Sequence, residues 1–218
     1  WVALSMIGVS SIAMTLFTSR PVGDAMATTI WGTSSSWTLT ALPLFVWMGE
    51  ILFRTKLSEN LFEGLSPWMQ KLPGGLIHVN VVGCALFAAI SGSSAATVAT
   101  VGKMSIPELR KRNYPEKILL GSLAGSGTLG LLIPPSIILI IYGVTVQESI
   151  AKLFVAGIIP GIMIALIFMG YVILWSLFNK KEMPTILTDY SFLEKIKKSG
   201  QLIPVILLII SVIGSIYT

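Results

Sequence analysis

Charge and cysteine are both scarce in this chain of 218 residues, and each shortage excludes a class of protein. Charged residues make up 11% of the sequence and hydrophobic residues 54%, which is far more apolar than a soluble domain. The single cysteine, Cys84, excludes an internal disulfide and a metal cluster held by cysteines. The composition therefore indicates an all-α protein that crosses a membrane several times.

The residue sets typical of enzymes are also missing. His78 is the only histidine, and neither an acid nor a nucleophile stands beside it. Residues 125–130 match the letters G-x-G-x-x-G, but they lie in an apolar segment without a preceding strand. The net charge of +5 comes from basic residues in short loops, which membrane topology explains better than nucleic-acid binding. We therefore expect no catalysis and no nucleic-acid partner.

The first third of the chain reads as two spans and a surface helix. Residues 1–19 and 37–53 are the expected spans, and 20–36 is expected to be a polar connection. Glu50, near the end of the second span, suggests an interfacial or structural role. Residues 57–72 predict an amphipathic helix, which either lies in the membrane interface or is an ordinary connecting helix.

The last third contains two further spans, expected at 153–178 and 201–217. A short helix is predicted between them over 189–200, with Gly200 as its C-cap. The chain opens on Trp1 and on an apolar run without a basic region before it. We therefore expect no signal peptide, and we expect the chain to be part of a longer protein.

The middle third opens with 31 uncharged residues at 72–102, if His78 is counted as neutral. A straight helix needs about 20 residues to cross a bilayer. Ser91, Gly92, Ser93 and Ser94 interrupt the segment and leave a second piece of roughly 10 residues, which at about 1.5 Å per residue spans half of the hydrocarbon core. The segment therefore predicts a re-entrant helical hairpin.

The basic residues of the loops support this topology. Loops 54–71, 103–117 and 179–198 hold 3, 5 and 5 lysines or arginines, whereas loops 18–36 and 144–152 hold one each. A re-entrant hairpin divides these residues 13 to 2 between the two sides, and a simple span divides them 11 to 4 at best. The positive-inside rule favours the hairpin by a modest margin.

A second interrupted segment follows at 118–147, and it is long enough to span even when broken. Small and polar residues interrupt it, followed by a pair of prolines: Gly125, Ser126, Gly127, Thr128, Gly130, Pro134 and Pro135. One such break is explained well by close helix packing. Lipid cannot form hydrogen bonds with the N–H and C=O groups of an interrupted helix, so such breaks occur where protein or a water-filled cavity covers them. Two breaks in consecutive uncharged segments therefore favour a solute site.

Each break offers chemistry for an ion and for an acid. The last carbonyls of a helix that ends near Ser91 have no partners within the helix and can bind Na⁺, helped by neighbouring hydroxyls. The N–H groups of a helix that starts near Ser93 or Ser94 suit a carboxylate. No acidic residue lies in either segment, which favours Na⁺ over a proton carrier. The candidate Na⁺ residues are Ser91, Gly92, Ser93, Gly125, Ser126, Gly127, Thr128 and Gly130.

A family resemblance runs through about residues 38–178. The chain resembles the large membrane subunit of the tripartite ATP-independent periplasmic (TRAP) transporters. The matching stretches are Leu42-Pro43-Leu44-Phe45 with Gly49-Glu50, Gly74-Gly75-Leu76 with Asn80-Val81, Phe87 to Ser94, Ile106-Pro107-Glu108-Leu109, Gly130 to Ser136, and Ser149 to Gly161. By motif, Ser91 to Ser94 match the hairpin tip of the family. Gly130, Pro134, Pro135 and Ser136 match its broken helix, and residues 125–128 follow it less closely.

The resemblance implies one half of an inverted-repeat elevator transporter. Residues 1–72 would be scaffold helices and an amphipathic arm helix, 73–147 the first half of the transport domain, and 148–218 scaffold helices and a connecting arm. The transport half would hold a re-entrant hairpin at 74–102 and a broken helix at 118–143. Candidate substrate contacts are Ser93, Ser94, Pro134 and Pro135.

The family further implies Na⁺-coupled import of an organic acid, such as a dicarboxylate or a sialic acid, across a bacterial inner membrane. The implied partners are a small membrane subunit, a periplasmic substrate-binding protein, membrane lipid and the C-terminal half of the same subunit. The sequence leaves open an ion channel or passive pore, whose filter also uses carbonyls. A membrane-embedded enzyme fits least well. Uncoupled ohmic flux would distinguish a channel from a symporter.

Overall fold

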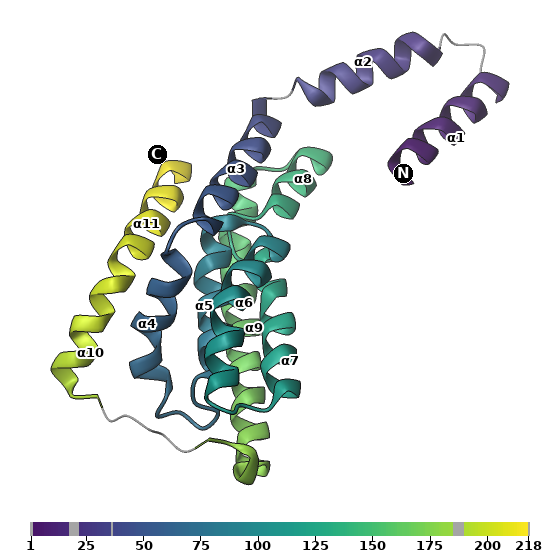
Figure 1. The fold of residues 1–218 in the computed structure, drawn as a ribbon. Helices are drawn as coiled ribbons and strands as arrows, with labels where there is room; N and C mark the ends of the chain where they lie inside the picture. Colours follow the sequence, from purple (N-terminus) through teal and green to yellow (C-terminus); the bar gives the residue numbers. More distant parts are fainter. Residues whose placement is uncertain (1, 18–21, 36, 185–189, 218) are drawn as a thin grey trace. The chain divides into compact units, whose positions relative to one another are not determined.

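A computed structural model describes residues 2–17, 22–35, 37–184 and 190–217, and all the regular structure within them is helical. The chain divides into two compact units, residues 1–41 and 42–218 (Figure 1). The all-α fold expected from the sequence is therefore confirmed for the described residues. The two units are considered separately below.

The first unit holds α1 (Val2–Phe17), α2 (Val22–Ser34) and the 3₁₀ turn η1 (Trp37–Thr40). The prediction of a polar connection at 20–36 is wrong, because most of it forms α2. The hydroxyl of Thr28 donates to the Asp24 carbonyl at 2.8 Å and that of Thr29 to the Ala25 carbonyl at 2.7 Å. These bonds let threonines sit inside a helix, so the polar composition does not prevent one.

The second unit begins with α3 (Ala41–Phe53) and α4 (Leu57–Met69). The 13 residues of α3 rise about 20 Å, so the full span predicted at 37–53 is not a single α-helix. Pro43 has no N–H to bond one turn back, which explains the 3₁₀ turn before α3. Glu50 pairs with Arg54 at 2.9 Å on the exposed surface, a local structural role.

Helix α4 is the amphipathic helix predicted at 57–72. Its apolar residues are buried in the main hydrophobic core, as the connecting-helix alternative requires, and they are Leu57, Leu61, Phe62 and Leu65. Helix α4 also meets the C-terminal part of the chain. The indole Nε1 of Trp68 donates to the Ser199 hydroxyl at 2.8 Å, and the Gln201 amide donates to Glu63 at 2.8 Å.

Three helices form the centre of the unit: α5 (Ile77–Ser91), α6 (Ser94–Lys111) and α7 (Glu116–Gly127). Twelve of the 15 residues of α5 are buried, so α5 is the central element. Val79, Gly83, Val101 and Met104 line one small cavity, which shows that α6 runs back along α5 as an antiparallel hairpin (Figure 1). The predicted interruption between Ser91 and Ser94 is confirmed.

Helix α6 is longer than the sequence suggested, because it continues from residue 102 to Lys111. Lys103, Arg110 and Lys111 are exposed while Ser105 and Leu109 are buried, so the charges lie on one side of a continuous helix. Lysine, methionine, glutamate and arginine are good helix formers. The first charge therefore marks the end of the apolar stretch and not the end of the helix.

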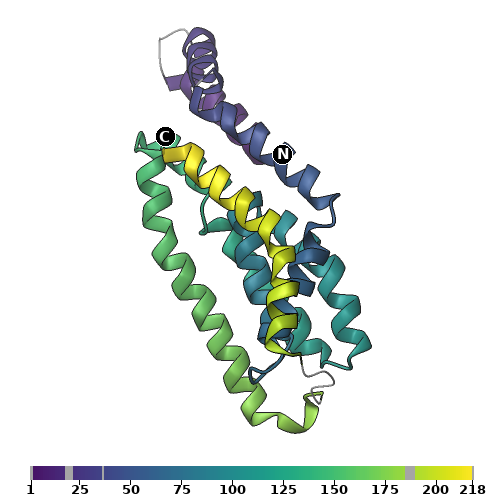
Figure 2. The same cartoon turned by 90° about the vertical axis from the view of Figure 1, so that its left-hand side faces the viewer.

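The second predicted break is also confirmed. Helix α7 ends at Gly127, and the chain continues through the 3₁₀ turn η2 (Thr128–Leu131) to α8 (Ile137–Val146). Next comes α9 (Ile150–Phe178), which runs along the whole length of the unit (Figure 2). Then follow the 3₁₀ turn η3 (Lys180–Glu182), α10 (Phe192–Ser199), the 3₁₀ turn η4 (Gly200–Leu202) and α11 (Ile203–Tyr217).

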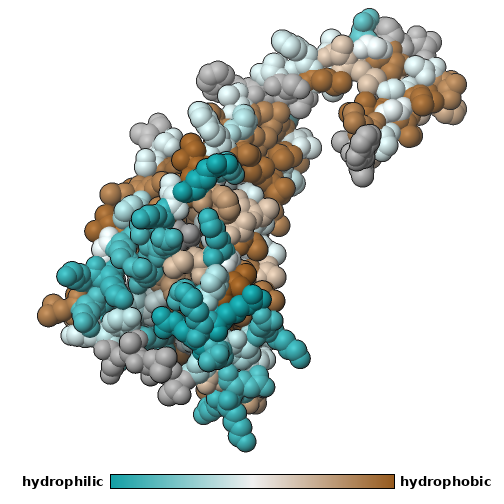
Figure 3. All heavy atoms as spheres, viewed as in Figure 1, coloured by the Kyte–Doolittle hydropathy of each residue, from teal (hydrophilic) through white to brown (hydrophobic). Residues whose placement is uncertain are grey.

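Among the described residues, two stretches are long and apolar enough to cross a membrane: 29 residues at Ile150–Phe178 and 24 at Phe192–Ser215. The predicted helix at 189–200 is α10, and Gly200 is its C-cap. The φ angle of Gly200 is −55°, so the chain does not turn there but continues through η4 into α11. Hydrophilic residues gather over the lower part of the unit, where Figure 1 shows the α6–α7 connection (Figure 3).

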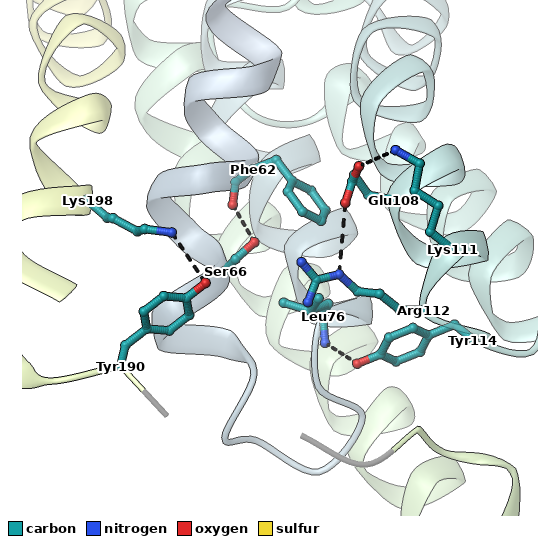
Figure 4. A network of polar contacts seen from close by, with 9 residues as sticks. All are labelled: Phe62, Ser66, Leu76, Glu108, Lys111, Arg112, Tyr114, Tyr190 and Lys198. Atoms are coloured by element: carbon teal, nitrogen blue, oxygen red, sulfur yellow. Dashed lines mark hydrogen bonds and ion pairs between the residues drawn. The ribbon is translucent and has the colours of Figure 1, made fainter. Parts of the chain in front are cut away.

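The base of the hairpin is closed by Tyr114, which lies between α6 and α7. The Leu76 N–H, next to the first turn of α5, donates to the Tyr114 hydroxyl oxygen at 3.0 Å (Figure 4). A tyrosine phenol is already protonated near neutral pH, and burial raises the pKa of Tyr114 further. Glu108 pairs with Lys111 at 3.0 Å beside it. Both ends of the hairpin therefore lie at the same end of the protein.

Replacing Tyr114 by Phe should leave the buried Leu76 N–H without its acceptor and destabilise the protein by about 1–3 kcal/mol. Thermal unfolding in detergent measures the change. Tyr142→Phe is the matched control, because Tyr142 is 54% exposed on α8, and its unfolding midpoint should stay at the parental value. Equal midpoints for the two variants would show that Tyr114 does not fasten the hairpin.

Candidate functional site

The tip of the α5–α6 hairpin is a sharp left-handed turn at Gly92. Its φ of 60° is a conformation that glycine adopts without strain. A methyl group placed on Gly92 would come within 2.6 Å of the Pro135 carbonyl oxygen. Glycine is therefore required here twice, for the turn and for the close approach of another backbone.

Hydroxyl groups gather inside the tip. The Ser91 and Thr97 hydroxyls lie 3.0 Å apart, and the Thr97 hydroxyl donates to the Ser93 carbonyl at 2.8 Å. Ser93 is the N-cap of α6, and its hydroxyl accepts from the Ala96 N–H at 3.4 Å. The Ser94 hydroxyl oxygen is buried and has no hydrogen-bond partner among the described residues. The tip thus collects neutral oxygens that could face a cation.

The break after α7 meets this tip directly. The Ile137 N–H, at the start of α8, donates to the Gly92 carbonyl at 3.2 Å. A methyl group on Gly130 would lie 2.8 Å from the Ser94 backbone nitrogen, and one on Gly127 would overlap the Val98 side chain. The structure therefore brings together Gly92, Ser93, Ser94, Gly127, Gly130 and Pro135, which lie in two separate segments of the sequence.

Other candidate residues of this second break face elsewhere. Gly125 packs on α9, where a methyl group would lie 3.3 Å from the Phe168 ring. The Ser126 hydroxyl donates to the Ser122 carbonyl at 2.6 Å and lies 3.4 Å from the Asn80 carbonyl of α5. Thr128 is exposed, and its hydroxyl donates to the Gly125 carbonyl at 2.7 Å. In this chain, Gly125 and Ser126 contact neighbouring helices, and Thr128 faces outward.

The two prolines are both buried at the break and are joined by a cis peptide bond. The Pro135 carbonyl faces Gly92, as described above. Pro134 lines an apolar cavity of about 270 Å³, together with Ala89 of α5, Ile162 of α9 and Ile213 of α11. Pro134 therefore lies in apolar surroundings, and Pro135 offers a carbonyl oxygen to the tip.

Two further helices cover the site. Gly49 of α3 packs on Ser91. A methyl group placed on Gly49 would lie 3.7 Å from the Ser91 carbonyl oxygen. On the opposite side, a methyl group on Gly157 of α9 would lie 2.7 Å from the Leu132 carbonyl oxygen. The interrupted backbone is thus covered by a neighbouring helix at Ser91 and at Leu132. This is the condition under which such breaks occur at membrane depth.

The electrostatics of the tip come from backbone ends and neutral oxygens. The C-terminus of α5 and the N-terminus of α6 meet at Gly92 and Ser93, so carbonyls and N–H groups face one region. Among the described residues, no group of three or more His, Cys, Asp or Glu side chains could hold a metal ion. A cation at the tip would have to bind to carbonyls and hydroxyls.

Two polar residues of this region, Thr97 and Asn80, were not among the site residues predicted from the sequence. Thr97 completes the hydroxyl cluster with Ser91, and Asn80 connects α5 to α7. Thr97 lies six residues after Ser91 and one turn after Ser93. That spacing is a signal only once α6 is known to start at Ser94.

Comparison with known proteins identifies one family. The family model described as "Tripartite ATP-independent periplasmic transporter, DctM component" matches residues 1–218. Among curated relatives, the C4-dicarboxylate TRAP transporter large permease protein DctM of Pseudomonas aeruginosa is 33% identical over 212 residues, which are 97% of this chain and 49% of that protein. The chain thus spans about half the length of this Pseudomonas aeruginosa relative.

Two other relatives match a smaller share of the chain at a higher identity. The 2,3-diketo-L-gulonate TRAP transporter large permease protein YiaN of Escherichia coli is 40% identical over 63% of this chain and 32% of its own length. The sialic acid TRAP transporter permease protein SiaT of Haemophilus influenzae is 38% identical over 62% of this chain and 22% of its own length.

Replacing Gly92 by Ala should destabilise the protein, because the left-handed turn costs about 1–2 kcal/mol with a side chain and the methyl group meets the Pro135 carbonyl. Thermal unfolding in detergent reports the loss. Gly121→Ala is the control: no atom lies within 4 Å of its methyl position, and alanine favours the α7 helix by about 1 kcal/mol. If Gly92→Ala unfolds at the parental temperature or above, the tip does not contact the break as described.

Proposed function

Because the chain belongs to the family described as the tripartite ATP-independent periplasmic transporter, DctM component, we propose that it is part of a secondary transporter that imports an organic acid across a bacterial inner membrane. The observation that carries this proposal is the contact between the hairpin tip at Gly92 and the broken segment at Gly130 and Pro135. Transporters place substrate and ion where interrupted helices face one another.

Na⁺ is the proposed coupling ion. The oxygens at the tip are neutral: the Ser91 and Ser94 hydroxyls and the carbonyls that end α5. Na⁺ is a hard cation and is bound by oxygen ligands, whereas proton coupling within a membrane generally uses a carboxylate. The sequence places no Asp or Glu between residues 72 and 107, which supports Na⁺.

A carboxylate is the proposed substrate group. The N–H groups that begin α6 at Ser94 lie next to Gly130, and a helix N-terminus favours an anion. Ser93 and Ser94 are the proposed contacts, with Pro134 and Pro135 shaping the far side of the break. The relatives named for C4-dicarboxylate, 2,3-diketo-L-gulonate and sialic acid support a carboxylate of this class.

The working protein is proposed to be larger than this chain, which covers 49% of the Pseudomonas aeruginosa relative. A second hairpin and broken helix in a C-terminal half would complete the site. The hairpin and broken helix would form the first half of a moving transport domain, and the other helices would form scaffold and arms in contact with lipid. A small membrane subunit and a periplasmic substrate-binding protein are the proposed partners.

Uptake by the full-length transporter in proteoliposomes tests this function. Radiolabelled C4-dicarboxylate, sialic acid and diketogulonate should be compared, with and without an inward Na⁺ gradient and with and without the binding protein. Accumulation of one acid that requires the gradient is expected. Ohmic current without accumulation would indicate a channel and would contradict the proposal.

The ligands of the ion are tested by alanine variants of the tip. Removing a hydroxyl that binds Na⁺ should cost about 1.5–3 kcal/mol, which is roughly ten- to a hundredfold in affinity. At least one of Ser91→Ala and Ser94→Ala should therefore raise the Na⁺ concentration for half-maximal uptake by that factor. Thr145→Ala is the control, because its hydroxyl bonds within α8 to the Ile141 carbonyl. Parental Na⁺ dependence in both serine variants would exclude these hydroxyls as ligands.

A further inference from the structure

Asn80 is a buried polar residue in the middle of an apolar helix. It lies on α5 with no exposed surface, between Val79 and Val81, which are also buried. Its side-chain amide donates to two groups of α7: the Ser122 hydroxyl at 3.1 Å and the Leu119 carbonyl at 3.3 Å. Asn80 therefore joins two central helices that are about 40 residues apart in sequence.

A third contact continues this line toward the break. The Ser126 hydroxyl lies 3.4 Å from the Asn80 backbone carbonyl. Leu119, Ser122 and Ser126 are spaced three and four residues apart, so they form one face of α7. This face rests on α5, and Asn80 contacts it over two helical turns.

The side-chain amide of Asn80 lowers the stability of the folded protein at this position. Its Oδ1 atom has no hydrogen-bond partner among the described residues, and an unsatisfied buried polar atom destabilises a protein. An apolar side chain would fill the same space without that cost. Buried asparagines in packed helices are best known for fixing how two helices align, at the expense of stability.

The alignment of α7 decides which residues face the hairpin tip. Gly127 directly follows Ser126, and it meets α6 where any side chain would overlap Val98. Each residue turns a helix by about 100°. A shift of α7 by one residue along α5 would therefore bring Ser126 or Thr128, in place of Gly127, against Val98. It would also move Gly130 away from the Ser94 backbone.

We propose that Asn80 is the positioning residue that sets the rotation and depth of α7 against α5, so that the glycines of the break close on the hairpin tip. Asn80 itself touches neither Ser91 nor Ser94 in any contact described above. It acts through α7, and its effect on transport rests on the function proposed in the preceding subsection.

The full-length transporter in liposomes, in a Cys84→Ser background, allows a direct geometric test. Ala95 and Thr128 are exposed on the two sides of the contact, so nitroxide labels at these positions report the distance distribution across it by the dipolar broadening of their continuous-wave electron paramagnetic resonance spectrum. Asn80→Ala should broaden or shift this distribution. Thr100→Val is the matched control: Thr100 is buried on α6, its hydroxyl has no partner among the described residues, and the variant should keep the parental distribution.

Uptake measured on the same proteins separates positioning from general stability. Asn80→Ala should raise the Na⁺ concentration for half-maximal uptake, on the order of tenfold as for other residues that orient ligands, with a similar amount of protein in the membrane. An unchanged distance distribution in Asn80→Ala, or a changed one with parental Na⁺ dependence, would overturn the inference. Uptake by the parent that does not depend on Na⁺ would instead refute the proposed coupling, and the distance measurement would still decide the role of Asn80.

Discussion

Backbone that is interrupted within an apolar stretch needs hydrogen-bond partners from protein or from a water-filled cavity, and the contact between the two breaks of this chain meets that constraint. The tip at Gly92 and the break before Ile137 cover one another, and the Ile137 N–H bonds to the Gly92 carbonyl. Glycines make this contact possible: Gly92 and Gly130 at the contact itself, and Gly157 where α9 lies against the Leu132 carbonyl. The arrangement leaves the end of α5 and the start of α6 facing the region where the tip meets the break, which is the physical basis of the proposed ion and acid site.

The positions of the two breaks could be predicted from the sequence because their causes are local. Glycine, serine and proline interrupt apolar runs for reasons of backbone conformation and hydrogen bonding, and these reasons hold in any context. The lengths of the helices could be predicted less well from the sequence. The helix α2 accommodates Thr28 and Thr29, whose hydroxyls bond back to carbonyls of the same helix, and α6 passes Lys103 because its charges fall on an exposed side. Composition alone indicates neither of these contacts.

The candidate site was predicted as a region but not in its inner details. Gly92, Ser93 and Gly130 stand out by sequence, and the structure places them at the contact. Gly125 and Ser126 stand out equally, yet they pack on α9 and α5, because a rotation of about 100° per residue separates neighbours on a helix. Thr97 and Asn80 were not predicted as site residues, since the role of a polar residue depends on partners that the fold brings to it: Ser91 for Thr97, and Leu119 and Ser122 of α7 for Asn80.

The central claim is that the hairpin enters and leaves on one side of the membrane, so that its tip meets the break inside. Labelling of single cysteines with a membrane-impermeant thiol reagent, in a Cys84→Ser background of the full-length transporter, tests it most directly. Lys71 precedes the hairpin, Lys111 ends it, and Lys152 begins α9 beyond the break. The account predicts that cysteines at 71 and 111 react from the same face and that one at 152 reacts from the opposite face. Reaction of 71 and 111 from opposite faces would contradict it.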